Sequence, residues 1–285
     1  MFTCNLMGGL GNQLFQIFAL ISYAIKHNQT FAFLNSNVVG NGKTIIRHTY
    51  WKTFLVSLTI FVKNVLPNCT LMIKETGFEY DELPSPTPKF AQSNEFAMLY
   101  GYFQSYKYFE ENYGQIAKLI RLDAQKERVK QFLPMNMYEV ISMHFRMGDY
   151  KKIPNMYPIA TATYYKNSIA FIKQRLTNLK QINILYFCEE DDIDDVLPII
   201  NEIKNEYGNC VFDHVSNDIP DWQQMLMMSL CSHNIIANST FSWWGAYFNS
   251  FPKRIVCYPE VWFGPLGANK DTKDLFPPTW NRIKC

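Results

Sequence analysis

The second half of the chain alternates short apolar segments with amphipathic ones, and this alternation constrains the fold more than any other feature of the sequence. Runs rich in β-branched and aromatic residues predict strands at Ile182–Cys188, Cys210–Asp213, Asn234–Ala237 and Arg254–Tyr258. Apolar residues at helical spacing predict helices at Thr163–Leu176, Asp191–Tyr207, Asp221–Ser232 and Phe241–Phe248. We expect Asp221 to cap the third helix. Strands and helices that alternate in this way form a parallel, doubly wound sheet.

The first half shows a looser version of the same pattern. A strand is predicted at Phe2–Met7, and Tyr108–Lys130 reads as helical with a break near Gly114 and a restart around Asp123. The charge-rich end of that helix is expected to join two halves of the chain. The predicted architecture is therefore α/β, with two Rossmann-like domains whose parallel sheets face a cleft. Residues 1–130 form the N-terminal domain and residues 131–285 form the C-terminal domain.

Composition excludes several classes of protein. With 48% hydrophobic residues the chain is globular rather than disordered, and a net charge of +2 argues against a nucleic-acid surface built on bulk charge. The seven cysteines are odd in number and lack the close spacing of zinc or redox sites, which indicates a reducing compartment. The most apolar segment, Phe54–Leu66, is too short to span a bilayer. We therefore expect a soluble, cytoplasmic protein without a membrane anchor.

Tyr138–Tyr150 carries the strongest single motif, with the sequence YEVISMHFRMGDY. Its first half predicts a buried strand, and His144, Arg146 and Asp149 follow where that strand must end. In open α/β sheets, ligands bind outside the carboxyl ends of the strands. The planar fork of an arginine suits phosphate oxygens. The motif thus predicts a phosphate or diphosphate anchor, and the alternative is an Arg–Asp pair that only ties down a loop.

A second phosphate-binding pattern opens the chain. The predicted first strand is followed by Gly8-Gly9-Leu10-Gly11-Asn12-Gln13 and then by an apolar helix. Glycines let a backbone approach a diphosphate, and a helix N-terminus presents unpaired N–H groups. The dinucleotide fingerprint would need a glycine at Leu14, and the Gly-Lys-Ser/Thr ending of an ATP-binding loop is absent. The alternative is a tight strand-to-helix turn with no ligand.

Two further stretches lie between a predicted strand and a predicted helix. In Glu189–Asp195, the pair Asp192-x-Asp194 matches a metal-binding pattern of sugar transferases, but acids in a first helical turn also stabilise the helix, and we favour that interpretation. Asn238-Ser239-Thr240-Phe241-Ser242 offers small hydrogen-bonding side chains that predict a neutral anion cradle, with ordinary N-capping as the alternative. Trp243 and Trp244 are expected in the core.

Together these motifs resemble the α-1,2-fucosyltransferases, in their bacterial-type form. The resemblance is carried by segments that span nearly the whole chain in the family's order: GGLGNQLFQ (residues 8–16), GFEYDELP (77–84), GYFQSYKYF (101–109), HFRMGDY (144–150) and NSTFSWWGAYF (238–248). The resemblance implies a GT-B-like enzyme that moves L-fucose from GDP-fucose to the 2-hydroxyl of a terminal β-galactose on a glycan. It also implies inversion and no metal or other cofactor. The expected lack of a membrane anchor and stem predicts a soluble enzyme of bacterial or viral type.

The family's HxRRxDY motif carries residue roles over to this chain. Arg146 is expected on the donor diphosphate, His144 near the nucleotide, and Asp149 beside them. The further donor contacts implied by the other motifs are Gly9, Gly11, Asn12, Asn238, Ser239, Thr240 and Ser242. One departure stands out, because the motif's second arginine is Met147 here. We expect either weaker donor binding or compensation by a nearby lysine such as Lys151.

The sequence leaves several points open. Asp149 and His144 are the candidates for a base on the acceptor hydroxyl, and Asp218 or Asp221 for recognition of guanine. Acceptor choice is expected in loops such as Asn35–Lys43. A GDP-sugar transferase with another acceptor, as in protein O-fucosylation, is one alternative function. A catalytically inactive relative that binds a glycan or nucleotide is the other.

Overall fold

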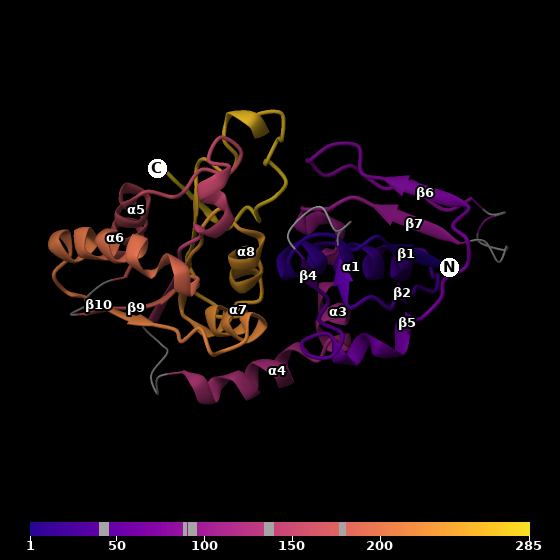
Figure 1. The fold of residues 1–285 in the computed structure, drawn as a ribbon, viewed down its shortest axis with the longest axis horizontal. Coiled ribbons are helices and arrows are strands. Elements are labelled where there is room, and N and C mark those ends of the chain that lie inside the picture. The colour runs from indigo at the N-terminus through magenta and orange to yellow at the C-terminus, as the bar shows by residue number, and fades with distance from the viewer. Residues whose placement is uncertain (40–45, 88–89, 91–95, 134–139, 177–180) are drawn as a thin grey trace. The chain divides into compact units, whose positions relative to one another are not determined.

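The computed structural model describes residues 1–39, 46–87, 90, 96–133, 140–176 and 181–285 (Figure 1). Residues 40–43 of the predicted acceptor loop and Tyr138 of the predicted strand lie outside this part. The chain divides into two compact units. Unit 1 comprises Met1–Gln125 and Lys270–Pro277, and unit 2 comprises Lys126–Asn269 and Pro278–Cys285. Each unit is described by itself.

Unit 1 is built on a parallel sheet in the strand order β1-β7-β6. These strands are β1 (Phe2–Cys4), β7 (Ala97–Tyr100) and β6 (Leu71–Lys74). A parallel bridge from Phe2 to Phe31 leads from β1 toward β2 (Phe33–Leu34), which pairs in parallel with β5 (Val62–Lys63). The short strands β3 (Val38–Val39) and β4 (Arg47–His48) form an antiparallel pair. Between Tyr50 and Leu66 the chain forms a 3-10 helix at Val56–Phe61, followed by β5.

Helix α1 (Leu10–Lys26) supplies the core of unit 1, because its side chains from Leu14 to Ala24 are buried without a break. Phe18 of α1 meets Phe109 edge-on at 5.4 Å between ring centroids. Helices α3 (Tyr113–Leu119) and α4 (Leu122–Val129) follow. The predicted break near Gly114 was wrong, because the helix breaks at Arg121, whose φ of 54° is left-handed. The predicted restart near Asp123 is confirmed.

Unit 2 holds a six-stranded sheet in the order β10-β9-β8-β11-β12-β13, and every pairing in it is parallel. Its strands are β8 (Val140–His144), β9 (Ile182–Phe187), β10 (Cys210–His214), β11 (His233–Ile235), β12 (Val256–Pro259) and β13 (Asn281–Ile283). Numbered within the unit, the order is 3-2-1-4-5-6, which is the order of dinucleotide-binding folds. The direction of winding therefore reverses between the adjacent strands β8 and β11.

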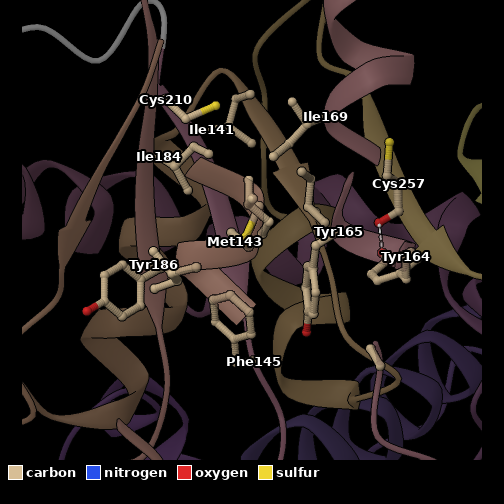
Figure 2. Close-up of a cluster of buried hydrophobic side chains, with 14 of the residues drawn as sticks. Ile141, Met143, Phe145, Tyr164, Tyr165, Ile169, Ile184, Tyr186, Cys210 and Cys257 are labelled. Atoms are coloured by element: carbon tan, nitrogen blue, oxygen red, sulfur yellow. Dashed lines mark hydrogen bonds between the residues drawn. The ribbon is translucent and has the colours of Figure 1, made fainter. Parts of the chain in front are cut away.

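The helices of unit 2 cover the two faces of this sheet. They are α5 (Ala162–Lys173), α6 (Ile193–Glu206), α7 (Asp221–Leu230) and α8 (Thr240–Tyr247). Ile141 and Met143 of β8 point into a buried cluster with residues of α5 and α6, and Figure 2 shows Phe145 beside Tyr165 and Tyr186 in it. The alternate residue Ser142 accepts a hydrogen bond from Asn234 Nδ2 at 2.7 Å, and Asn234 Nδ2 also donates to Met228 O of α7. Hence α7 and α8, which pack against each other, cover the opposite face.

The predicted strands and helices from Val140 to Tyr258 all occur, and the expected α/β class with parallel sheets is confirmed. Asp221 is not the N-cap of α7, because Pro220 takes that position and Asp221 is the first helical residue. Strand β13 was not predicted. The remaining elements are 3-10 turns at Tyr106–Tyr108, Glu110–Asn112, Lys130–Phe132, Gly148–Lys152, Glu190–Asp192 and Pro265–Gly267. In the described residues, no helix combines the length and apolarity needed to cross a bilayer.

Candidate functional site

Two of the sequence motifs lie side by side in unit 2, at the point where the winding of the sheet reverses. HFRMGDY follows β8 and NSTFSWW follows β11, and these strands pair directly, with Met143 opposite Ile235. The loop after β8 is tied to the loop after β11 by Tyr150, whose hydroxyl donates to Asn238 O at 3.2 Å. Ligands of open α/β sheets bind at such a switch point, outside the carboxyl ends of the strands.

Arg146 is the cation of its motif, and its side chain is largely buried, with 16% of it exposed. One terminal nitrogen of its guanidinium donates to Asp149 and the other donates to Glu189, which follows β9. The Tyr150 ring lies under the guanidinium, 4.9 Å from ring centroid to Cζ. The Arg–Asp pair of the alternative interpretation therefore exists, and Glu189 adds a second carboxylate to it. A planar fork held in this way is oriented for a two-point contact with an anion.

His144 ends β8 on the face covered by α8, with its ring 5.6 Å from the Phe241 ring. Burial, reinforced by the positive charge of Arg146, lowers the pKa of His144 to about 3, so the ring is neutral near pH 7. Its Nδ1 atom is buried and has no hydrogen-bond partner among the described residues. A neutral imidazole with this pKa is a weak base, and it suits a hydrogen bond to a ligand better than removal of a proton.

Met147 points away from this anchor. Only 4% of it is exposed, and its side chain belongs to the buried cluster between the sheet and helices α5 and α6. Lys151, the predicted substitute for a second arginine, instead pairs with Asp192 and Asp195. Two carboxylates of the acidic stretch therefore already neutralise this ammonium group, and compensation by Lys151 stays a prediction.

The acidic stretch Glu189–Asp195 shapes the loop that carries Arg146. Asp192 stands at the N-cap position of α6 but makes no side-chain cap. Its buried carboxylate accepts from Gly148 N at 2.7 Å and pairs with Lys151 at 2.7 Å. The predicted placement of acids in the first helical turn is confirmed for Asp194 and Asp195 of α6. No group of three or more metal-ligating side chains occurs within the described parts of the chain.

The predicted anion cradle after β11 is largely engaged in local hydrogen bonds. Asn238 Nδ2 donates to Pro158 O at 2.8 Å and to Trp262 O at 3.1 Å, and its buried Oδ1 has no partner in the described residues. Ser239 is the N-cap of α8 and accepts from Phe241 N. Ser242 is fully buried and donates to Ser239 O at 3.4 Å. Thr240, the first residue of α8, is half-buried. The expected burial of Trp243 and Trp244 is confirmed.

The glycine loop lies in unit 1, between β1 and α1. Gly8 has a φ of +75°, and a Cβ atom there would lie 2.4 Å from Asn12 Nδ2, so only glycine fits. Gly9 is the N-cap of α1 and has no side-chain cap, while Gly11 is buried in the first helical turn. Asn12 is half-buried, and its Oδ1 accepts from Gln104 Nε2 at 3.0 Å.

Two buried glutamines of α1 form hydrogen bonds with the backbone of this loop. Their role was not predicted from the sequence. Gln13 Nε2 donates to Gly8 O at 3.0 Å and to His48 O at 2.9 Å. Gln16 Oε1 accepts from Met7 N at 2.8 Å, and its Nε2 donates to Met7 O. The available signal was that both are polar positions in an otherwise apolar helix. Glu189 was likewise missed as a partner of Arg146.

The motifs GFEYDELP and GYFQSYKYF both contact Asp274, a residue in the C-terminal part of the chain. Asp274 accepts from Tyr80 N at 3.2 Å and pairs with Lys107 at 2.5 Å, and its carbonyl oxygen accepts from Ser105 Oγ. Glu75, just before the first motif, accepts from Tyr102 N and Phe103 N in the second. These two motifs therefore fix loops at the carboxyl ends of β6 and β7 and fasten the segment Lys270–Pro277 to unit 1.

Comparison with known proteins gives one family. The model of glycosyl transferase family 11 matches residues 1–284. An α-1,2-colitosyltransferase of Escherichia coli is 29% identical, covering 99% of this chain and 98% of that protein. A galactoside 2-α-L-fucosyltransferase of Caenorhabditis elegans is 24% identical, covering 97% and 75%.

A solved structure of an Arabidopsis thaliana FUT1 mutant in complex with GDP shares the fold with a TM-score of 0.50 at 12% identity, covering 97% of this chain and 74% of that one. The likeness concerns the fold alone, and it agrees with the predicted GT-B-like class. The match of the family model along the chain confirms the resemblance to α-1,2-fucosyltransferases and their relatives. The chain belongs to glycosyl transferase family 11.

Proposed function

We propose that this protein transfers L-fucose from GDP-fucose to the 2-hydroxyl of a terminal β-galactose, with inversion and without a metal ion. Unit 2 is proposed to hold the donor, with Arg146 on the diphosphate and His144 beside the nucleotide. The glycine loop of unit 1, through Gly9, Gly11 and Asn12, is proposed as a further donor contact. The acceptor would then meet unit 1.

One observation carries this proposal. The two motifs that resemble the donor-binding motifs of the α-1,2-fucosyltransferases follow the adjacent strands β8 and β11 at the switch point of the sheet. Arg146, largely buried and paired with two carboxylates, lies at that place. Nucleotide diphosphates bind at switch points of such sheets, and an arginine fork is a strong diphosphate ligand.

Arg146 would supply the electrostatic work of the reaction. Fucosyl transfer passes through an oxocarbenium-like state while the departing GDP gains negative charge. A donor group aimed at that charge in advance stabilises the transition state more than the ground state. Removal of such a group typically lowers the rate about 10²–10³-fold. Arg146 would therefore act on the leaving group in the way a metal ion does in other transferases.

Asp149 remains the proposed base, if the acceptor hydroxyl needs one. The pKa of His144, about 3, disfavours proton removal by this ring. Asp149 carries a carboxylate beside Arg146 with 28% of its side chain exposed, so a ligand can reach it. We propose His144 as a neutral hydrogen-bonding group for the donor, because its Nδ1 is buried without a partner in the described residues.

A second donor is favoured by one observation. The relative at 29% identity is named for transfer of colitose, which is fucose without its 3-hydroxyl group, whereas the relative named for fucose is 24% identical. Both sugars would present the same diphosphate to Arg146. The second candidate function is therefore transfer of colitose from its GDP derivative to the same hydroxyl.

The test is GDP release from GDP-fucose with lactose as acceptor and EDTA present, with GDP-colitose assayed in parallel. We expect turnover of one donor, a product linked at the 2-hydroxyl of galactose, and no effect of EDTA. Arg146→Ala is expected to lose about 10²–10³-fold in kcat. Arg282→Ala is the matched control, since this arginine is 66% exposed on β13 and pairs with Glu260.

The outcomes separate the alternatives. Turnover of neither donor, with binding of GDP retained, would leave an inactive relative or a different acceptor. Full activity of Arg146→Ala would refute the proposed diphosphate anchor. A loss of activity in Arg282→Ala as large as in Arg146→Ala would show that the effect is not specific to the site.

A further inference from the structure

The proposed diphosphate anchor is already occupied by two carboxylates of the protein. Arg146 donates through one terminal nitrogen to Asp149 and through the other to Glu189. Asp149 belongs to the same loop, three residues further on, whereas Glu189 comes from the end of the neighbouring strand β9. A diphosphate that binds both terminal nitrogens would compete with these two carboxylates for the guanidinium.

The charges around Arg146 also oppose the binding of a further anion. One guanidinium faces two carboxylates, so this group of three carries a net charge of −1. Lys151 offers little relief, because it pairs with Asp192 and Asp195. Met147, where the family's motif has a second arginine, is buried in the core. A diphosphate would therefore meet an anchor that already has excess negative charge.

Of the two carboxylates that pair with Arg146, Glu189 is the one that a ligand can displace. Its side chain is 58% exposed, against 28% for Asp149, and among the described residues Arg146 is its one charged partner. It reaches the anchor past Gly148, where a Cβ atom would lie 2.8 Å from Glu189 Oε2. Because more than half of the Glu189 side chain already lies in water, its rotation away from Arg146 should cost little, and exposed ion pairs are weak.

We propose that Glu189 occupies the place of the donor diphosphate on Arg146 in the unliganded protein, leaves when the nucleotide sugar binds, and returns as GDP departs. This exchange rests on the proposed function, since it assumes a nucleoside diphosphate at Arg146. Glu189 is thus a competitor within the chain. It lowers the affinity of the site for GDP and speeds release of that product.

The test measures binding of GDP and of inorganic pyrophosphate to Glu189→Gln by isothermal titration calorimetry. Glutamine keeps the length of the side chain but removes the charge that holds Arg146. We expect both ligands to bind about threefold to tenfold more tightly, because an exposed ion pair contributes less than a tenfold change in an equilibrium constant. The rate of GDP release should fall by a similar factor.

Glu190→Gln is the matched control, since it removes the same charge one residue further on, from a side chain that accepts from Asn217. It should leave both affinities unchanged. The change Glu189→Gln is also made in an Arg146→Ala background, where it should have no effect if Glu189 acts through that arginine.

Unchanged or weaker binding by Glu189→Gln, or equal tightening by Glu190→Gln, would overturn the exchange. If Arg146→Ala still weakens GDP in that case, the proposed function survives without it. If the wild type binds pyrophosphate but not GDP, the proposed nucleotide fails, and the response of pyrophosphate binding to Glu189→Gln still decides the exchange.

Discussion

The hydroxyl of Tyr150 lies 3.2 Å from the carbonyl oxygen of Asn238, so the loops that follow β8 and β11 are joined by a hydrogen bond. Burial raises the pKa of Tyr150 to about 12, which keeps this hydroxyl protonated as a donor at any pH near neutrality. The same ring lies under the guanidinium of Arg146. Tyr150 therefore couples Arg146 in the loop after β8 to Asn238 in the loop after β11.

Tyr150→Phe removes that hydrogen bond and keeps the ring under Arg146. We expect the KM for the donor to rise roughly threefold to tenfold, because a lost hydrogen bond of about 1 kcal/mol loosens the pairing of the two loops. Tyr186→Phe is the control, since no described residue bonds to its hydroxyl on β9. Steady-state kinetics of both variants check the prediction, and an unchanged KM for Tyr150→Phe would contradict it.

Asp192→Asn should disturb the Arg146 loop through its backbone. The Asp192 carboxylate is 2% exposed and accepts from both Gly148 N and Lys151. We expect the free energy of unfolding to fall by about 2 kcal/mol, the cost of weakening charged hydrogen bonds in a buried place. Asp194→Asn, an exposed acid in the same helical turn, should cost less than about 1 kcal/mol. Urea denaturation measures both, and equal losses would refute the distinction.

Met147→Arg restores the residue of the family's motif but is expected to damage this protein. The side chain lies in the core cluster, so an arginine there would bury an unpaired charge or force the loop outward. We expect the free energy of unfolding to fall by roughly 3 kcal/mol with no gain in donor affinity. Met147→Leu should remain within about 1.5 kcal/mol of the wild type. Tighter binding of GDP-fucose by a stable Met147→Arg protein would show that the loop can turn this position toward the ligand.

Local sequence predicted the elements of unit 2 because each strand and helix there carries its own apolar periodicity. Strand β13 was not predicted because Asn281–Ile283 is three residues long and mostly polar. The helix break was misplaced because Gly114 is tolerated in the first turn of α3, whereas the break falls at Arg121, a non-glycine residue with a left-handed φ that no local pattern indicates. Propensity thus identified the helical region but not its interruption.

The site was predictable where its residues are neighbours in sequence and unpredictable where they are not. Arg146 and Asp149 are three residues apart, and their pairing was weighed as an alternative from the sequence. Glu189 joins the same guanidinium from 43 residues away, and Gln104 reaches Asn12 across 92 residues. The strand order of the two sheets makes these contacts. The sequence alone does not reveal this strand order. It therefore could not show that Glu189 pairs with Arg146, or that Asp192 and Asp195 pair with Lys151.

Two buried histidines should make the protein sensitive to acid. Burial lowers the pKa of His233 to about 4, and burial with the charge of Arg146 lowers that of His144 to about 3, whereas the unfolded chain has values near 6.5. Between about pH 6.5 and pH 4 the unfolded chain binds protons that the folded protein does not, so stability is lost as pH falls. Each histidine contributes a slope of up to about 1.4 kcal/mol per pH unit.

His233→Asn tests this dependence, because its Oδ1 can accept from Ile255 N as His233 Nδ1 does at 3.0 Å. The free energy of unfolding of this variant should fall by roughly 2 kcal/mol less than that of the wild type between pH 6.5 and pH 4.5. His48→Asn, at an exposed histidine, controls for the loss of one imidazole. Urea denaturation across this range gives the slopes, and parallel curves for wild type and His233→Asn would refute the prediction.

Two glycines of unit 1 should respond to alanine in opposite directions. At Gly101 a Cβ atom would lie 2.4 Å from Glu75 Cβ and 2.7 Å from its Oε2 atom. Gly101→Ala must therefore displace the carboxylate that binds Tyr102 N and Phe103 N, and we expect a loss of about 1–3 kcal/mol in the free energy of unfolding. At Gly114, in helix α3, a Cβ atom would meet nothing within 4 Å, so Gly114→Ala should add about 0.5–1 kcal/mol. The two substitutions are chemically identical, so opposite shifts in the urea midpoint would attribute the difference to Glu75, whereas shifts of the same sign would refute the role given to it.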